Sequence, residues 1–371
     1  MKIGVITTQY SPNFGALLQT FALQKYLGSI DSVDFVEVID YFPKHAKAFW
    51  NVYSEKKDIK NVLHNLYLFL HQKNVKARKK QFEIFRQFIN DNIKCSRRFS
   101  AADISSTRDM YDALICGSDQ IWNLTRHDDP IWFLYFTRGW NEKIKFAYAP
   151  SIADKIPSQY YDHVKDYIGN LDQVSVRESV DVDQLKMITG EDTFHACDPV
   201  FLLSQNEWSR LIPKVDIKYP YIFCYFISTG EYAVSVVKKL KEITGLDVLH
   251  VNVNVRDRFD SKWDIRNCSP FEFISYIKNA MYVCTNSFHC TAFSLLFRKN
   301  FVVVPKTTAN SRMESLMIKA NIGDRFIYPE KLETLQKGDL TVNYSSSNLD
   351  TWINESKEYI YRGLQINGQD N

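Results

Sequence analysis

One histidine stands where an apolar segment of the sequence gives way to a helical one. Residues 285–291 read Thr-Asn-Ser-Phe-His-Cys-Thr, and the three residues before them are apolar or aromatic. Side chains that follow a strand of an open α/β sheet face its ligand crevice, and the first N–H groups of a helix attract anions. We therefore expect His289, with Asn286 and Ser287, to bind a phosphate or a carboxylate. The alternative is a polar turn whose histidine only caps a helix.

Cations follow two other apolar segments. Arg177 ends one of them, and Lys306, Asn310 and Arg312 follow the other. A guanidinium can hold a carboxylate or phosphate through two parallel hydrogen bonds, which an ammonium group cannot. We predict that these cations and His289 surround a small polyanion. For Arg177, a structural ion pair with the adjacent glutamate is the alternative.

An acid, an amide and an indole follow the apolar residues 113–116. The polar cluster consists of Gly117, Ser118, Asp119, Gln120 and Trp122. Such a group suits a sugar, whose hydroxyls need acceptors and whose ring packs on an aromatic face. We expect Asp119 to accept a proton from an attacking hydroxyl. Alternatively, Asp119 caps the next helix.

A turn containing Asn13 and Gly15 precedes the first segment of helical period. The glycine would let the backbone approach a ligand closely. The turn has neither the dinucleotide-binding nor the Walker pattern, so the sequence does not indicate a nucleotide site. A plain turn would also account for these residues.

Short apolar segments alternate with segments of helical period along the whole chain. The expected strands are residues 3–6, 36–39, 113–116, 146–149, 174–176, 221–226, 248–251, 282–284 and 301–304. Strands separated by helices predict right-handed βαβ units and parallel sheets. At 371 residues the chain exceeds the usual single core. We predict an α/β fold with two Rossmann-like doubly wound domains that face a cleft, residues 1–205 and 206–348, with a linker near 204–220. Residues 349–371 form a helix that can pack back on the first domain.

Composition excludes several classes of protein. The net charge of +3 is small for this length and does not indicate binding to nucleic acid. Seven scattered cysteines predict reduced core thiols rather than disulfides or a zinc site, and we expect no bound metal. The chain starts directly in a strand, without a leader, and has no apolar stretch of about 18 residues. We therefore expect a cytoplasmic protein.

A basic segment precedes an apolar stripe at helical spacing. Its cations are Lys73, Lys76, Arg78, Lys79 and Lys80. The simpler interpretation is a solvated helix face opposite a packing stripe that includes Phe82 and Phe85. The functional interpretation is a surface that rests against anionic lipid, at the cytoplasmic face of the membrane, or against a diphosphate headgroup.

In this order, the motifs resemble those of the polysaccharide pyruvyl transferase family. The resemblance is carried by Asn13-Phe14-Gly15-Ala16 with Gln19, by Ile115-Cys116-Gly117-Ser118-Asp119-Gln120-Ile121-Trp122-Asn123, by Ser175-Val176-Arg177-Glu178, by Asp198-Pro199, by Thr285-Asn286-Ser287-Phe288-His289 and by Asn310-Ser311-Arg312. It implies a fold similar to glycosyltransferase type B, with the acceptor on the N-terminal domain and the donor on the C-terminal domain. It also implies phosphoenolpyruvate as co-substrate, with no other cofactor, and a pyruvate ketal on two hydroxyls of a sugar in a surface polysaccharide precursor, free or linked to a lipid diphosphate.

In the same resemblance, Arg177 and His289 match donor-binding positions. Many members carry an arginine where this chain has Ser287, so Lys306 or Arg312 would have to supply that charge. His289 would protonate the donor's methylene carbon, and Asp119 would deprotonate the sugar hydroxyl. Two rival hypotheses remain: a glycosyltransferase of the same fold that uses a nucleotide sugar, and a non-catalytic protein that binds glycans or anions.

Overall fold

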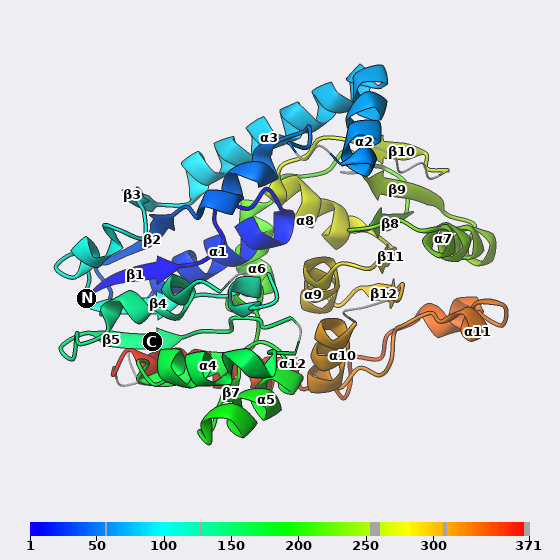
Figure 1. Ribbon diagram of the computed structural model, residues 1–371. Coiled ribbons are helices and arrows are strands. Elements are labelled where there is room, and N and C mark those ends of the chain that lie inside the picture. The colour runs from blue at the N-terminus through cyan, green and yellow to red at the C-terminus, as the bar shows by residue number, and fades with distance from the viewer. Residues whose placement is uncertain (56–57, 127, 154, 253–259, 307–309, 367–371) are drawn as a thin grey trace.

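The strands form two parallel sheets, each flanked by helices (Figure 1). The computed structural model describes residues 1–371 except 56–57, 127, 154, 253–259, 307–309 and 367–371. The seven-stranded sheet has the order β3-β2-β1-β4-β5-β6-β7, and the five-stranded sheet has the order β10-β9-β8-β11-β12. The strands are β1 (Lys2–Ile6), β2 (Phe35–Tyr41), β3 (Cys95–Phe99), β4 (Ala113–Cys116), β5 (Ile144–Ala147), β6 (Gln173–Val176), β7 (Phe194–His195), β8 (Tyr221–Tyr225), β9 (Asp247–Val251), β10 (Trp263–Ile265), β11 (Tyr282–Thr285) and β12 (Asn300–Val303).

Helices connect these strands and cover both faces of the sheets (Figure 1). The α-helices are α1 (Phe14–Leu27), α2 (Ile59–Leu70), α3 (Gln72–Asn92), α4 (Tyr161–Ile168), α5 (Ser179–Thr189), α6 (Gln205–Leu211), α7 (Glu231–Thr244), α8 (Pro270–Asn279), α9 (Phe288–Leu296), α10 (Ser311–Ala320), α11 (Pro329–Leu332) and α12 (Leu349–Gly363). The 3₁₀ helices are η1 (Lys44–Trp50), η2 (Ile104–Thr107), η3 (Gln120–Trp122), η4 (Pro130–Phe133), η5 (Tyr135–Thr137), η6 (Ser158–Tyr160), η7 (Pro199–Phe201) and η8 (Lys337–Leu340).

Both sheets reverse their strand order at the first strand of the series. The reversal lies between β1 and β4 in one sheet and between β8 and β11 in the other. Ligand crevices of doubly wound sheets open at such points, beyond the carboxyl ends of the strands. Residues 117–122 follow β4 and residues 286–289 follow β11, so both clusters start at a reversal. The predicted α/β class with two doubly wound sheets is confirmed.

Each of the nine expected strands is present, with ends shifted by at most a few residues. Three short strands, β3, β7 and β10, were not expected. The segment expected as a linker, residues 204–220, contains helix α6, whose first turn is fixed by a capping box between Ser204 and Glu207. Trp208 of α6 is fully buried and donates its indole N–H to the carbonyl of Val200 at 2.9 Å. The first half of this segment is therefore docked helix.

Aromatic side chains join the two domains into one continuous hydrophobic core. Phe14 at the start of α1 stacks on Phe273 of α8, with ring centroids 4.4 Å apart and planes inclined by 5°. Trp208 meets Phe293 of α9 edge to face at 5.2 Å. Domains in one chain usually move relative to each other unless their interface is large and apolar. This interface therefore holds the edges of the two sheets at a fixed spacing.

The terminal helix α12 packs on the first domain, although it follows the second in sequence. Trp352 donates its indole N–H to the carbonyl of His195 at 2.8 Å, and Tyr359 donates its hydroxyl to the carbonyl of Ala147 at 2.9 Å. Ser356 accepts a hydrogen bond from the backbone of Cys197 at 3.0 Å. The chain thus closes the first domain with its last helix.

Candidate active site

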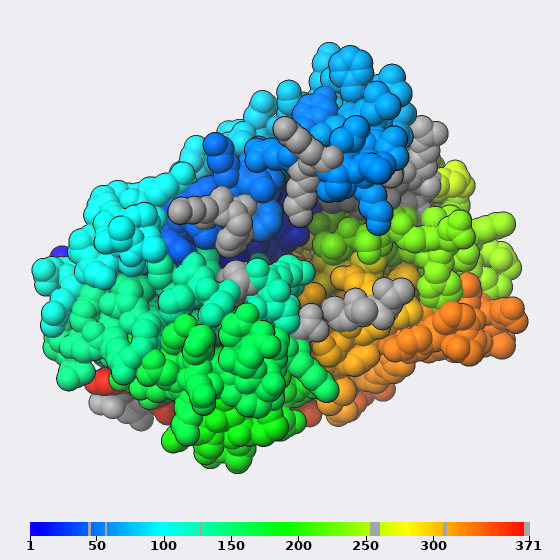
Figure 2. Space-filling view, in the orientation of Figure 1, coloured from blue at the N-terminus to red at the C-terminus, as the bar shows by residue number. Residues whose placement is uncertain are grey.

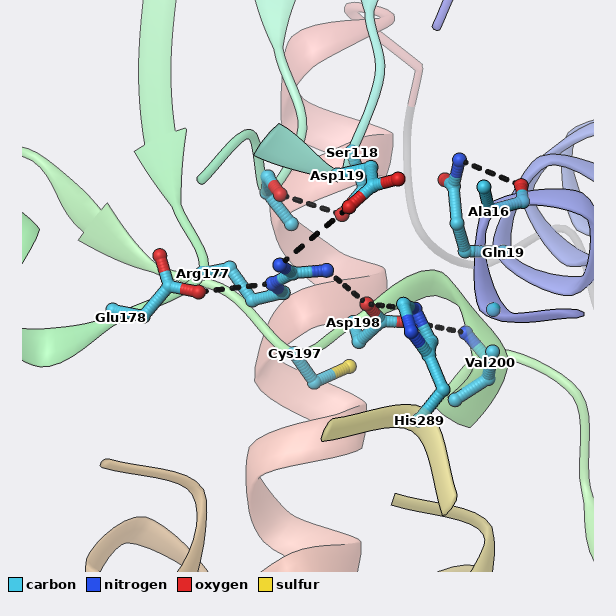
Figure 3. Close-up of polar contacts among 12 residues, drawn as sticks. Ala16, Gln19, Ser118, Asp119, Arg177, Glu178, Cys197, Asp198, Val200 and His289 are labelled. Carbon is cyan, nitrogen blue, oxygen red and sulfur yellow. Dashed lines mark hydrogen bonds and ion pairs between the residues drawn. The ribbon is translucent and has the colours of Figure 1, made fainter. Parts of the chain in front are cut away.

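A buried carboxylate, that of Asp198, occupies the centre of the site (Figure 3). It accepts a hydrogen bond from Nη1 of Arg177 at 2.7 Å and one from the backbone of Val200 at 3.1 Å. Arg177 follows β6, is itself buried, and donates from Nε to Glu178 at 3.0 Å. Burial alone would raise the pKa of Asp198, but His289 and Arg177 beside it lower that pKa to about 2. The carboxylate is therefore charged at neutral pH, and Arg177 is paired twice.

His289 reaches the same carboxylate from the second domain. Its Nε2 lies 3.3 Å from Oδ2 of Asp198, an ion-pair distance at which the ring is not aligned for a hydrogen bond. The other edge of the ring faces α1, where a Cβ added to Gly15 would come within 2.0 Å of Nδ1. We expected Gly15 to admit a ligand. Instead, its missing side chain makes room for the imidazole, which is clamped between the two domains.

Asp119 adopts a backbone conformation that ordinary side chains avoid. Its φ of 74° and ψ of −176° belong to a region used almost only by glycine. Its carboxylate accepts a hydrogen bond from Thr8 at 2.9 Å and lies 4.0 Å from Nη2 of Arg177. It makes no capping bond to η3, which excludes the alternative role as a helix cap. The strained turn aims the carboxylate at the arginine network.

Two further cations approach from the second domain. Arg312 opens α10, and Gln120, with its amide oxygen facing the guanidinium, accepts from it at 2.5 and 3.3 Å. Burial and the neighbouring Arg177 lower the pKa of Arg312, while burial and Arg312 lower the pKa of Lys306 to about 8. Within the described residues, Nε of Arg312 and Nη2 of Arg177 are buried without hydrogen-bond partners. Residues 307–309 of this predicted cluster lie outside the described residues. Unsatisfied buried donors of this kind fit an anion.

Three polar residues expected to contact substrate hold the backbone instead. Asn13 caps α1 by accepting from its first backbone N–H groups. Asn286 accepts from the backbone of Ile227 and donates to the carbonyl of Ser228, both at 2.8 Å. Ser287 caps α9. These side chains shape the loops at the two strand-order reversals, and their expected role as ligand contacts stays a prediction.

Four other candidates also serve the scaffold. Ser118 is buried and donates its hydroxyl to a backbone carbonyl at 2.6 Å. A Cβ at Gly117 would press on Thr7, at 3.1 Å, and on the end of β1. Asn310 exchanges two hydrogen bonds with the backbone of Lys306. Trp122 is 1% exposed, and its N–H is bonded within the core. The expected aromatic wall for a sugar is therefore wrong, because the indole is part of the core.

Sequence reasoning quoted Asp198 only as a motif residue and gave it no role in the site, whereas the pairing of Arg177 with Glu178, given as the alternative, is present. A charged residue directly before Pro199 and directly after a buried pair, Ala196 and Cys197, was the available signal. A carboxylate placed at the end of a buried segment needs a buried cation. Arg177 was the obvious candidate.

Replacing Gly15 with alanine tests whether the imidazole occupies the space beside α1. In a helix, alanine is more favourable than glycine by roughly 0.5–1 kcal/mol, whereas a collision in a packed site costs about 1–3 kcal/mol. We expect Gly15→Ala to destabilise the wild-type protein and to stabilise a His289→Ala variant, as measured by urea unfolding. If Gly15→Ala changed the free energy of unfolding in the same direction in wild type and in His289→Ala, the imidazole would not fill the space beside Gly15.

Replacing Asp198 with asparagine removes the charge shared by Arg177 and His289. Since folding lowers the pKa of this carboxyl from 3.8 to about 2, its contribution to stability is complete above about pH 4 and is lost as the pH falls toward 2. We expect Asp198→Asn to lower the free energy of unfolding by about 3–5 kcal/mol at neutral pH. In urea unfolding, the difference in the free energy of unfolding between wild type and Asp198→Asn should become smaller below about pH 4. The exposed Asp31→Asn provides the control, and a difference that stays constant down to about pH 3 would contradict this pairing.

Solved structures share the fold of this chain over nearly its whole length. The UDP-GlcNAc 2-epimerase from Methanocaldococcus jannaschii is 10% identical with a TM-score of 0.53, covering 97% of this chain and 100% of that one. The UDP-bound MnaA of S. aureus is 12% identical with a TM-score of 0.52, covering 99% and 98%. Anabaena HepE with UDP and glucose is 9% identical with a TM-score of 0.51, covering 98% and 99%. At these identities the likeness concerns the fold alone, and it confirms a glycosyltransferase type B-like architecture.

No curated protein matches the sequence. Residues 13–305 match the polysaccharide pyruvyl transferase family. This match covers most of the chain and includes Arg177, Asp198 and His289, which meet at the centre of the site. The chain therefore belongs to the polysaccharide pyruvyl transferase family.

Proposed function

We propose that the chain transfers the pyruvyl group of phosphoenolpyruvate to two hydroxyls of a sugar in a bacterial surface polysaccharide precursor. The products are a cyclic pyruvate ketal and phosphate. One observation carries the proposal: Arg177 and His289, from opposite domains, share the carboxylate of Asp198, and the charge of Arg312 acts on Arg177 and on Lys306. No other cofactor is needed for this reaction.

The donor carries a carboxylate and a phosphate, and the uncompensated charge of the site is positive where Arg312 and Lys306 lie. Arg177 is already neutralised by Asp198 and Glu178, so its charge is not available in full. Arg312 lowers the pKa of Lys306, and Arg177 lowers the pKa of Arg312, so an anion beside these cations would relieve the repulsion. Arg312 thus supplies the positive charge that an arginine at the position of Ser287 supplies in other members.

Proton transfers in the proposed reaction balance as follows. His289 gives a proton to the methylene carbon, and the first sugar hydroxyl attacks the central carbon while Asp119 takes its proton. The bond from that carbon to the phosphate oxygen breaks, and phosphate leaves with the electron pair and takes up the proton that Asp119 accepted. The second hydroxyl then attacks the same carbon, and its proton returns to His289. Asp198 stabilises the charged imidazole, and the cations stabilise the departing phosphate.

An assay with phosphoenolpyruvate and hexose-containing glycans, free or lipid-diphosphate-linked, tests this function. We expect phosphate release together with a glycan mass gain equal to pyruvic acid minus one water. Arg312→Gln should lower kcat/KM by roughly 100-fold or more, because it removes a charged contact to the reacting anion. Lys319→Gln on the same helix is the control, since Lys319 pairs with Glu355 instead.

Other outcomes of this assay identify the rivals. Consumption of a UDP-sugar in place of phosphoenolpyruvate would indicate a glycosyltransferase. Binding of glycan or phosphoenolpyruvate without phosphate release, with every acceptor tried, would indicate a binding protein.

Asp119 links the strain of its turn to the proposed chemistry. Glycine adopts the observed backbone angles freely, whereas alanine retains a strain of about 1–3 kcal/mol. We expect Asp119→Gly to be more stable than Asp119→Ala by about that amount in urea unfolding. Both variants should lose about 100-fold or more in turnover, because both lack the base. Equal stability of the two variants would contradict the strained geometry, and retained turnover would remove Asp119 from the mechanism.

A further inference from the structure

Helix α2 presents an apolar stripe to solvent. Its exposed apolar residues are Ile59 (79%), Val62 (52%), Leu63 (59%), Leu66 (53%), Phe69 (67%) and Leu70 (70%). Their spacing of three and four residues places them on one face of the helix. In the described structure only Leu68 of this helix is buried. Figure 2 shows α2 projecting at the upper edge of the molecule, so the stripe lies on a protrusion. A contiguous exposed apolar surface of this kind marks an interaction site.

The charge around this stripe has one sign. Between Asp58 and Glu83 the sequence has no acidic residue. The lysines of α2 and of the adjoining start of α3 are exposed, namely Lys60, Lys73, Lys76, Lys79 and Lys80. Arg78 was expected on the same solvated basic face as these lysines, but it lies elsewhere. It packs over the ring of Phe82 and borders a cavity of about 160 Å³ between the domains, which Arg266 also lines.

We propose that α2 and the first turns of α3 form a membrane-binding surface for an anionic lipid bilayer. The apolar stripe of α2 enters the boundary between headgroups and acyl chains, and the lysines contact anionic headgroups. Among the described residues, no helix is long and apolar enough to cross a membrane. With 12 residues, α2 suits a position in the plane of the interface. This inference does not depend on the proposed reaction.

Charge complementarity favours lipid over a second copy of the chain. A twofold interface built on this stripe would bring each lysine-rich surface against its own copy. Like charges at such an interface repel, whereas each lysine near an anionic membrane strengthens binding by about fivefold. An anionic lipid surface is therefore the partner that can both bury the apolar stripe and pair with the lysines.

Sedimentation of the full-length protein with vesicles tests the proposal. We expect binding to vesicles of equal parts phosphatidylglycerol and phosphatidylcholine, weakened by salt, and little binding to phosphatidylcholine alone. The variant Leu63→Gln/Leu66→Gln/Leu70→Gln should bind at least about tenfold more weakly, because it removes half of the apolar stripe. The matched control, Met187→Gln/Ile318→Gln, changes residues that are 65% and 76% exposed elsewhere and should bind as wild type does.

A second pair of variants tests the charge. Lys73→Glu/Lys79→Glu/Lys80→Glu should abolish binding to the anionic vesicles, whereas Lys238→Glu/Lys337→Glu should not. All substituted positions are exposed, so the fold should persist. Phosphate release with a soluble acceptor should be unchanged in the membrane-binding variants, which separates this test from that of the reaction.

Three results would overturn the proposal. They are no binding of wild type to the anionic vesicles, equal binding of the glutamine variant and its control, and a wild-type dimer that dissociates in the glutamine variant. The last result would assign the stripe to a second copy of the chain.

Discussion

The buried carboxylate of Asp198 is the interaction on which the site depends. It faces Arg177 from its own domain and His289 from the other, so one charge fixes a side chain from each domain. A buried charge is tolerated only when it is paired, and removing one partner leaves the others uncompensated. The requirement reaches into the scaffold: Gly15 must lack a side chain for the imidazole to reach Asp198. The aromatic contact of Phe14 with Phe273 keeps α1 at that distance.

The site divides its charged groups into a neutralised set and an uncompensated set. Arg177 with Asp198 and Glu178 is rigid and internally paired. Arg312 and Lys306 enter from the second domain; burial and Arg177 oppose the charge of Arg312, and burial and Arg312 oppose the charge of Lys306. Preorganised charge of this kind needs no reorganisation when a substrate arrives. Burying these charges costs free energy, which is offset by the apolar core that the two domains share.

Much of the architecture could be predicted, because buried parallel strands are apolar runs separated by helical periods. Strand β3 could not, since its sequence Cys-Ser-Arg-Arg-Phe lacks that pattern, and Arg97 lies over the ring of Phe99 on this edge strand. In the site, the polar residues that follow the predicted strands indicated which segments of the chain meet. Arg177 and His289, for example, were expected to lie together, and they do. Local spacing could not reveal that Trp122 stacks on Phe133, with centroids 4.7 Å apart, inside the core. Nor could it reveal the exposure of α2, because an amphipathic period looks the same whether its apolar face is covered or open.

The return of α12 to the first domain affects how the chain is made. Trp352 and Tyr359 belong to the same hydrophobic core as β1 and α1, yet they are synthesised after the whole second domain. Multidomain chains commonly fold from the amino terminus during synthesis, one domain after another. Here the first domain lacks part of its interior until α12, which follows the whole second domain, has been synthesised. Until then the nascent chain leaves apolar surface of the first sheet uncovered, so the loss of α12 would leave this domain with an incomplete core.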